Sequence, residues 1–177
     1  RSGKKILFVG TKKQAKDIVN ESARKVNMPF VTERWLGGML TNKQTIGGRI
    51  KHLKDLEIRM ASGALEAKYN KLEVQRFQEE IDQMNSLYGG VKELADKPGA
   101  VFVVDVITQA NALSEARKLG LKTIAIADTN VDPTGIDYVI PANDDAIKTV
   151  QLITDYMVAA ITEGKNSQKT ASKEGDK

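Results

Sequence analysis

The side chains best suited to chemistry in this sequence are cations that can pair with phosphate. Residues 1–60 contain 14 Lys and Arg but only five Asp and Glu, whereas residues 61–177 contain 13 against 18. Lys and Arg bind a polyanion by displacing its counterions, so this polarity indicates one face for nucleic acid and another for solvent or a protein. For each single lysine, a solvated surface role is the alternative. The candidate phosphate-binding side chains are Lys12, Lys13, Lys16, Arg34, Lys43, Arg49, Lys51, Lys54 and Arg59.

An irregular loop around the only tryptophan lies in the middle of this basic region. Residues 34–42 read Arg-Trp-Leu-Gly-Gly-Met-Leu-Thr-Asn, which fits neither a helix nor a strand. The glycine pair permits positive φ and a close approach of the backbone, while Trp35 offers a large ring and one N–H donor. Trp35 could stack on a base, but an anchor inside the protein is the favoured interpretation. Trp35 and Asn42 complete the candidate RNA-binding set.

The elements that must position these residues alternate between strands and helices. Continuous apolar runs such as 100–104 are typical of strands buried on both faces of a parallel sheet. Alternation of this kind predicts an α/β three-layer sandwich with a mainly parallel sheet of five strands, like a flavodoxin or Rossmann fold. The predicted strands are 4–10, 29–32, 100–105, 122–128 and 138–140, and the predicted helices are 12–25, 111–119 and 144–161.

The region between the second and third strands breaks this alternation. Apolar residues recur at spacings of three and four over 46–60 and again over 74–88, with a linker through Gly63 between them. Two such stripes predict an antiparallel helical hairpin with coiled-coil-like packing. From Gly164 the chain loses all periodicity, which predicts a disordered tail. The predicted organisation is an α/β domain at 1–44 and 89–163, an inserted helical hairpin at 45–88 and a tail at 164–177.

Composition excludes several kinds of site. The chain has no cysteine, so it has no disulfide framework, thiolate metal site or cysteine nucleophile. The sole histidine, His52, has no second His or Cys and no Ser or acid at triad spacing, so we expect no metal and no catalytic residue. No apolar run approaches the ~20 residues of a membrane span, and the N-terminus lacks a signal pattern. These features favour a reducing, cytoplasmic compartment and no bound cofactor.

A set of motifs occurs in order along the chain, at residues 5–12, 34–42, 89–92, 115–120, 128–130, 132–133, 136–141 and 143–147. In this order they resemble the motifs of the ribosomal protein S-two family, the second protein of the small ribosomal subunit, in its bacterial or organellar form. The resemblance covers roughly residues 3–164, and its specificity comes from the whole set of motifs. Members usually carry an aromatic residue at the position of Lys43, and a lysine there suits a phosphate neighbour. The N-terminal region of the family, expected ahead of Ser2, is missing from this sequence.

The resemblance implies a structural, non-catalytic component of the small ribosomal subunit that acts in translation. Members bind rRNA at the back of the subunit, between head and body, and lie near other small-subunit proteins. They also help to recruit the large mRNA-binding protein of that subunit. We therefore expect a ribosome-bound protein of the cytoplasm or an organellar matrix, with no membrane contact and no small-molecule substrate.

Two other functions fit part of the pattern. In a phosphate- or nucleotide-handling α/β enzyme, Asp105, Asp128 and Asp132 would gather at the carboxyl ends of strands and could hold Mg²⁺. The turn at 10–12 is, however, neither a dinucleotide-binding glycine motif nor a P-loop. In an adaptor, the hairpin would be a docking arm and the acidic later part would face a basic partner. A steep salt dependence of RNA affinity favours phosphate docking, a flat one favours the adaptor, and stabilisation by Mg²⁺ with a nucleotide favours the enzyme.

Overall fold

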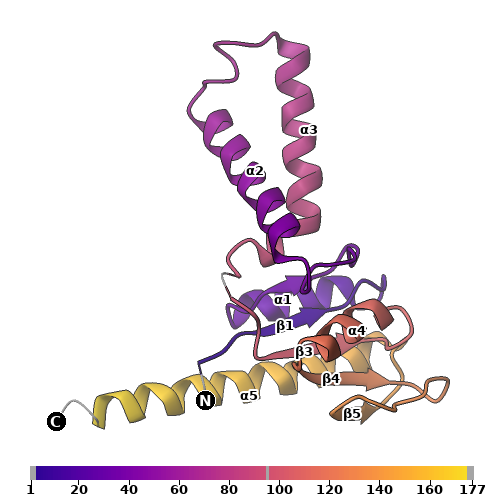
Figure 1. Cartoon of the computed structure of the whole chain (residues 1–177). Coiled ribbons are helices and arrows are strands. Elements are labelled where there is room, and N and C mark those ends of the chain that lie inside the picture. Colours follow the sequence, from indigo (N-terminus) through magenta and orange to yellow (C-terminus); the bar gives the residue numbers. More distant parts are fainter. Residues whose placement is uncertain (1–2, 95, 175–177) are drawn as a thin grey trace.

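A five-stranded, all-parallel sheet forms the centre of the molecule (Figure 1). The computed structural model describes residues 3–94 and 96–174, with side chains described through Ser167. The strand order is β2-β1-β3-β4-β5, so the predicted parallel sheet of five strands is confirmed. The strands are β1 (Ile6–Val9), β2 (Phe30–Val31), β3 (Ala100–Val104), β4 (Lys122–Ala127) and β5 (Tyr138–Pro141).

Apolar residues on both faces of the central strands explain why the sheet lies inside the molecule. Leu7, Phe8 and Val9 of β1 are at most 1% exposed. Phe8 lies beside Phe102 of β3, with the two ring centroids 5.3 Å apart. Leu7 and Val9 point to the opposite face, because side chains alternate along a strand. A sheet that is apolar on both faces needs cover on both, which makes it the middle of three layers.

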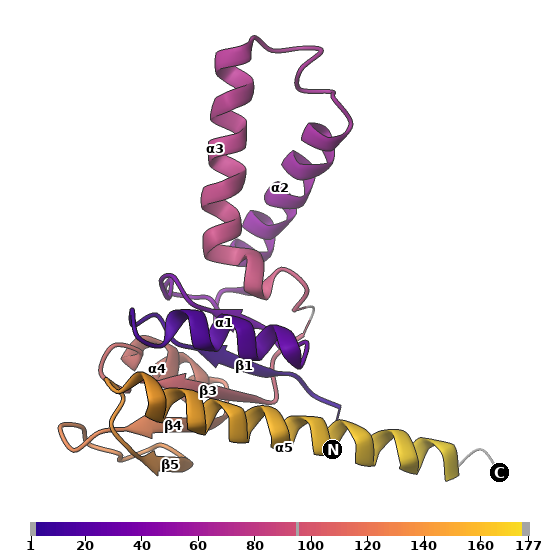
Figure 2. The same cartoon turned by 180° about the vertical axis from the view of Figure 1, so that it is seen from behind.

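Helices supply this cover (Figures 1 and 2). The helices α1 (Lys16–Lys25) and α5 (Ile147–Glu174) lie side by side over the face that carries Phe8. The helix α4 (Ala110–Lys118) and the base of a helical hairpin cover the face that carries Leu7. The predicted α/β sandwich is therefore confirmed.

Two helices, α2 (Lys43–Ala61) and α3 (Lys71–Tyr88), rise from the sheet body and diverge toward the tip (Figures 1 and 2). The side chain of Asn42 caps α2 by accepting a hydrogen bond from a backbone amide of the first turn. After α3, a single 3₁₀ turn, η1 (Gly89–Val91), leads the chain back toward β3. The two helices predicted between 45 and 88 therefore exist, and the first begins two residues earlier than predicted.

Contacts between α2 and α3 do not confirm the predicted coiled-coil packing. His52 bonds to Glu80, and Asn85 donates to Glu57, so polar pairs join the two helices. Such pairs can flank the apolar seam of an antiparallel helix pair, so they do not decide the packing. The helices pack together near the sheet body, where Leu53 is fully buried, and separate beyond it, so a coiled-coil seam along the whole hairpin is not confirmed (Figure 1).

The C-terminal helix is longer than predicted. Because α5 runs to Glu174, the disordered tail predicted from Gly164 is wrong for residues 164–174, and residues 175–177 lie outside the described part. The segment lacks an apolar stripe, but it contains Lys, Gln, Ala and Glu, which readily extend a helix that packing has already nucleated. The other domain boundaries stay predictions. Neither α5 nor another helix of the described residues has the length and apolar character needed to cross a membrane.

Candidate nucleic-acid interface

Backbone hydrogen bonds and a positive φ shape the loop between β2 and α2. Gly38 has a φ of 89°, and a Cβ atom added there would lie 3.0 Å from the Cβ of Asn42. The amide of Asn42 donates to the carbonyl of Gly38 at 2.8 Å, and the amide of Met39 donates to the carbonyl of Leu36 at 3.1 Å. Trp35 is 8% exposed and packs into the apolar cluster below the loop. The expectation that Trp35 is an internal anchor is therefore confirmed.

A buried carboxylate on α4 holds this loop. Glu115 is 7% exposed, and its Oε1 accepts hydrogen bonds from the indole of Trp35 at 3.0 Å and the amide of Gly38 at 2.7 Å. Its Oε2 accepts from the amides of Leu40 and Thr41 at 3.0 and 3.1 Å, and from the Thr41 hydroxyl at 3.1 Å. Burial raises the pKa of Glu115, but these donors outweigh burial and lower the pKa below its usual value. An ionised carboxylate therefore organises the loop from inside.

Five of the predicted cations are available on the surface of the loops and α2. Their side chains are exposed, and within the described residues none of them forms an ion pair, a hydrogen bond or a ring contact. A phosphate can approach such a cation without first breaking an internal contact. The five are Lys13, Arg34, Lys43, Arg49 and Lys51.

Three other predicted cations are each held by a carboxylate. Lys16 lies 2.6 Å from Glu33, and Lys54 lies 3.0 Å from Glu93. Arg59 lies 3.7 Å from an aspartate one turn earlier on α2. Exposed ion pairs contribute little to stability, yet each carboxylate cancels charge that a phosphate would otherwise meet. These cations are weaker candidates for RNA contact than the five unpaired ones.

Two members of the predicted set use their polar groups inside the protein. Trp35 gives its N–H to Glu115, and its ring is buried. Asn42 accepts a hydrogen bond from the amide of Thr45 at 3.2 Å and so caps α2. These two side chains build the loop and the start of the helix that carry the cations.

Comparison with known sequences identifies the family to which the loop and hairpin belong. Residues 1–164 match the family described as ribosomal protein S2. The chain belongs to this family. The small ribosomal subunit proteins uS2 of Bifidobacterium longum strains DJO10A and NCC 2705 are each 45% identical to it over 168 residues. That match covers 95% of this chain and 60% of each relative, so the chain spans about three fifths of their length. The family and both relatives are described as ribosomal proteins.

In this S2-family chain, an internal ion cluster occupies the crevice where the enzyme alternative placed a ligand. The strand order puts that crevice at the carboxyl ends of β1 and β3. The ammonium of Lys12 lies there, 2.6 Å from Asp145 and 2.9 Å from Asp144. Asp105, 3.5 Å away, completes the cluster. Burial lowers the pKa of Lys12, but the bonds to Asp145 and Asp144 outweigh burial and raise it. A lysine shared by three carboxylates is not available to a phosphate.

The other carboxylates of the enzyme alternative stabilise turns. Asp128 and Asp132 accept hydrogen bonds from backbone amides one and two residues later, at 2.6 and 2.9 Å. His52 of α2 pairs with Glu80 of α3 at 3.1 Å. In the part of the chain that the structure describes, no group of three or more His, Cys, Asp and Glu is arranged to hold a metal.

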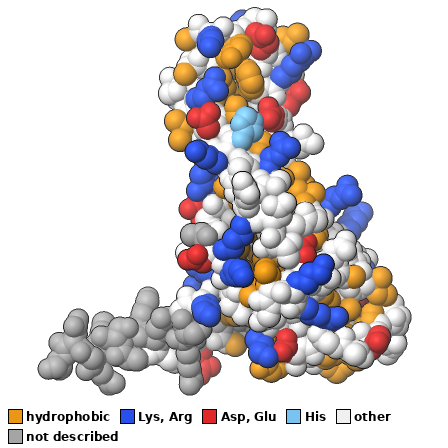
Figure 3. Space-filling model, in the orientation of Figure 1, with side chains coloured by type: hydrophobic (Ala, Val, Ile, Leu, Met, Phe, Trp, Pro, Cys, Tyr) orange, Lys and Arg blue, Asp and Glu red, His pale blue; other side chains and the backbone are white. Residues whose placement is uncertain are grey.

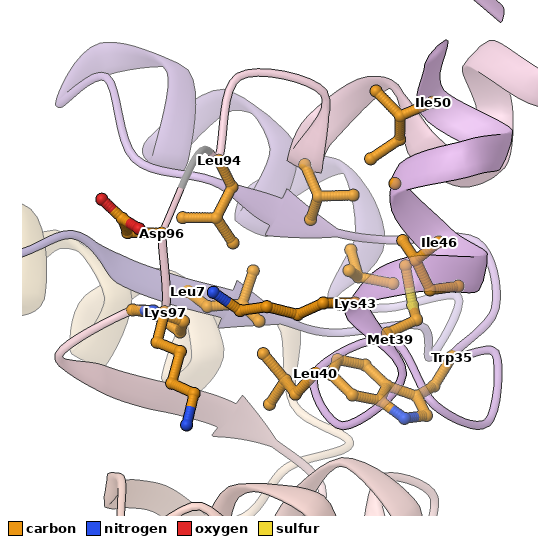
Figure 4. Close-up of a pocket in the computed structure, with 14 residues that line it drawn as sticks. Leu7, Trp35, Met39, Leu40, Lys43, Ile46, Ile50, Leu94, Asp96 and Lys97 are labelled. Atoms are coloured by element: carbon orange, nitrogen blue, oxygen red, sulfur yellow. The ribbon is translucent and has the colours of Figure 1, made fainter. Parts of the chain in front are cut away.

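A small apolar cavity lies at the base of the hairpin, where the loop, β1 and α2 meet (Figure 4). Its volume is about 130 Å³, well below the roughly 300–1,000 Å³ of typical ligand pockets. Trp35, Leu40 and Ile46 form part of its walls, and Lys43 and Lys97 stand at its edge. The cavity is too small for a nucleotide, but it brings a further exposed cation, Lys97, to the rim that carries Lys43.

Sequence reasoning missed Glu115 and Lys97 as contributors to this surface. Glu115 lies three residues after Ala112 and next to Ala116, on the buried stripe of α4. A carboxylate on an apolar stripe must find donors, because an unpaired buried charge is costly, and this signal could have identified it. Lys97 lies in an irregular segment, and nothing in the sequence relates it to Lys43.

Proposed function

We propose that this chain is a structural constituent of the small ribosomal subunit that binds rRNA through a rigid basic surface. We call this the docking surface. One observation carries the proposal: in a member of the S2 family, five exposed cations have no internal partner, and the backbone of the loop beside them is held by a buried carboxylate. The docking surface consists of Lys13, Arg34, Lys43, Arg49 and Lys51.

The position of Lys43 supports an anionic partner. Lys43 is the first residue of α2, and the first turn of this helix contains no acidic residue. The N-terminal end of a helix carries partial positive charge, so a cation there is unfavourable by about 0.3–1 kcal/mol, whereas an anion is favourable. A lysine at the end of a helix that attracts anions suits contact with a phosphate better than it suits stability of the helix.

The distribution of charge is also suited to RNA. Figure 3 shows Lys and Arg side chains along the hairpin and over its junction with the sheet body. Structured RNA is recognised largely through its backbone, its shape and its 2′-hydroxyl groups. A fixed display of cations is sufficient for this, and a deep pocket is not required.

We infer that ribosomal proteins are neighbours as well. The relatives are named small ribosomal subunit proteins. Three large side chains on β5 and α5 are each more than half exposed and offer apolar contact area: Tyr138, Leu152 and Tyr156. Such area suits other proteins of the subunit, among them the large mRNA-binding one. The chain would then reside on ribosomes of the cytoplasm or of an organelle.

Charge reversal tests the proposal. The variant Arg34→Glu/Arg49→Glu/Lys51→Glu should associate with small-subunit particles that lack this protein at least about tenfold more weakly, because three phosphate contacts become repulsive. Its thermal melting and circular dichroism should match the wild type, since these side chains have no partners among the described residues. Sedimentation with the particles measures the association.

A matched control changes the charge by the same amount elsewhere. Lys25, Lys118 and Lys148 are also exposed and, within the described residues, unpaired. The variant Lys25→Glu/Lys118→Glu/Lys148→Glu should sediment with the particles nearly as the wild type does. Equal losses for the two variants would show a response to net charge alone, and wild-type association of the first variant would rule out the docking surface.

A further inference from the structure

We infer that Glu115 is a positioning residue for RNA docking: its buried carboxylate holds Arg34 and Lys43 in their binding positions through the backbone of the loop. The inference rests on the proposed rRNA-binding function and adds to it a residue that does not touch RNA. Glu115 lies on α4, 80 positions after Trp35 in the sequence.

The hydrogen-bond pattern supports this role. The five donors to Glu115 lie within residues 35–41, which is all but the last residue of the stretch between the two cations. Arg34 immediately precedes the first donor, and Lys43 follows the last donor by two residues. Neither cation has a side-chain partner of its own within the described residues. Their positions therefore depend on the backbone that one carboxylate holds.

This role is distinguishable from an effect of charge. Glu115 is an anion close to a surface proposed to bind a polyanion. If it acted only through its charge, its removal would strengthen RNA binding, because one repulsive charge is lost. If it positions the loop, its removal must weaken binding, because the loop and two long side chains then have to be ordered on association. The two roles predict opposite signs.

The test uses Glu115→Gln, which keeps the shape of the side chain and removes its charge. We expect its affinity for RNA extracted from small ribosomal subunits to fall by about tenfold, which is the scale expected for re-ordering two long side chains. Glu21→Gln is the matched control, because Glu21 is exposed on α1 and has no partner among the described residues. That control should bind as tightly as the wild type or slightly more tightly. Unchanged or tighter binding by Glu115→Gln overturns the inference.

A double-mutant cycle separates positioning from a general loss of stability. In a chain that already carries Arg34→Ala and Lys43→Ala, Glu115→Gln should cause no further loss of RNA affinity, because the groups that it positions are gone. A purely structural role would cause the same loss in both backgrounds, and that result overturns the inference. Failure of the proposed rRNA-binding function would give a different result from failure of the inference about Glu115. In that case the variant with reversed charges at Arg34, Arg49 and Lys51 would bind RNA as the wild type does.

The single tryptophan reports directly on the loop. In Glu115→Gln, the emission of Trp35 should shift to longer wavelength while the far-ultraviolet circular dichroism stays unchanged, because an amide NH2 replaces one of the two acceptor oxygens, the loop loosens and the indole gains water. If Glu115→Gln does not fold, Thr41→Val removes one of the five donors and should weaken RNA binding by about two- to threefold. Thr45→Val makes the same chemical change at an exposed hydroxyl that does not bond Glu115, and should bind as the wild type does. Equal binding by Thr41→Val, Thr45→Val and the wild type overturns the inference.

Discussion

At the scale of the residue, the ionised state of Glu115 makes the fold sensitive to acid. In the folded chain the pKa of this carboxyl is lowered, because the effect of its hydrogen-bond donors outweighs the effect of burial. An unfolded glutamate has a pKa of about 4.3. A group with a lowered folded pKa contributes stability that is fully present above its unfolded pKa and is lost as pH falls through its folded pKa. The free energy of unfolding should therefore decrease as pH falls below about 4.

Urea titrations at several pH values between 5 and 2.5 measure this contribution. Glu115→Gln should be less stable than the wild type at pH 5 by about 2–4 kcal/mol, because several buried donors lose an anionic acceptor. The difference between the two proteins should shrink toward acid pH. A difference that stays constant down to pH 2.5 would contradict an ionised Glu115.

The sequence could predict only in part which cations are available to bind phosphate. Arg59 and Asp55 have the spacing of one helical turn, so the sequence could have indicated that this carboxylate pairs with the predicted cation Arg59. The partner of Lys12 at Asp144 lies 132 positions away, and no local pattern relates the two. Charge counts along the chain cannot reveal such pairs, because strand order decides which loops meet at an edge of the sheet.

At the scale of the element, α2 is less stable than a helix of its length could be. Gly47 and Gly48 lie inside the helix, both are exposed, and a Cβ atom at either would meet nothing within 4 Å. Helix formation at glycine costs about 0.8–1.0 kcal/mol relative to alanine. The variant Gly47→Ala/Gly48→Ala should therefore raise the free energy of unfolding by about 1–2 kcal/mol, which thermal or urea unfolding can measure.

Gly38 provides the control for this substitution. It has a φ of 89° and lies against Asn42, so Gly38→Ala should destabilise the chain. If the variant Gly47→Ala/Gly48→Ala is less stable than the wild type, α2 does not run through both glycines in solution.

The apolar patterns predicted which elements form but not how the hairpin helices meet. Runs of apolar residues are local, so the five strands and the two hairpin helices followed from them. The separation of α2 and α3 toward the tip does not follow from these local stripes (Figure 1). The connection between the two helices contains Leu65, which is fully buried although the linker looks polar. The helical extension of α5 has no apolar stripe, so periodicity could not reveal it.

At the scale of the whole molecule, the nine predicted phosphate-binding cations of residues 1–60 divide into two classes. Lys12, Lys16, Lys54 and Arg59 are neutralised by carboxylates, whereas the docking surface keeps its charge. Only unpaired cations release counterions from RNA on binding without first giving up an internal partner. The salt dependence of RNA affinity should therefore follow the number of unpaired cations and not the total number of Lys and Arg residues.

The salt dependence of RNA affinity tests this division. With five phosphates neutralised, the logarithm of the association constant should fall against the logarithm of salt concentration with a slope of about −3.5 to −4.5. Replacing Arg49 and Lys51 with alanine should make the slope shallower by about 1.4 to 1.8. Replacing Lys16 and Lys54, which are cations of the same region held by carboxylates, should leave it unchanged. A slope near zero in the wild type would favour a protein adaptor, and equal changes for both pairs of substitutions would mean that the internal ion pairs open to bind phosphate.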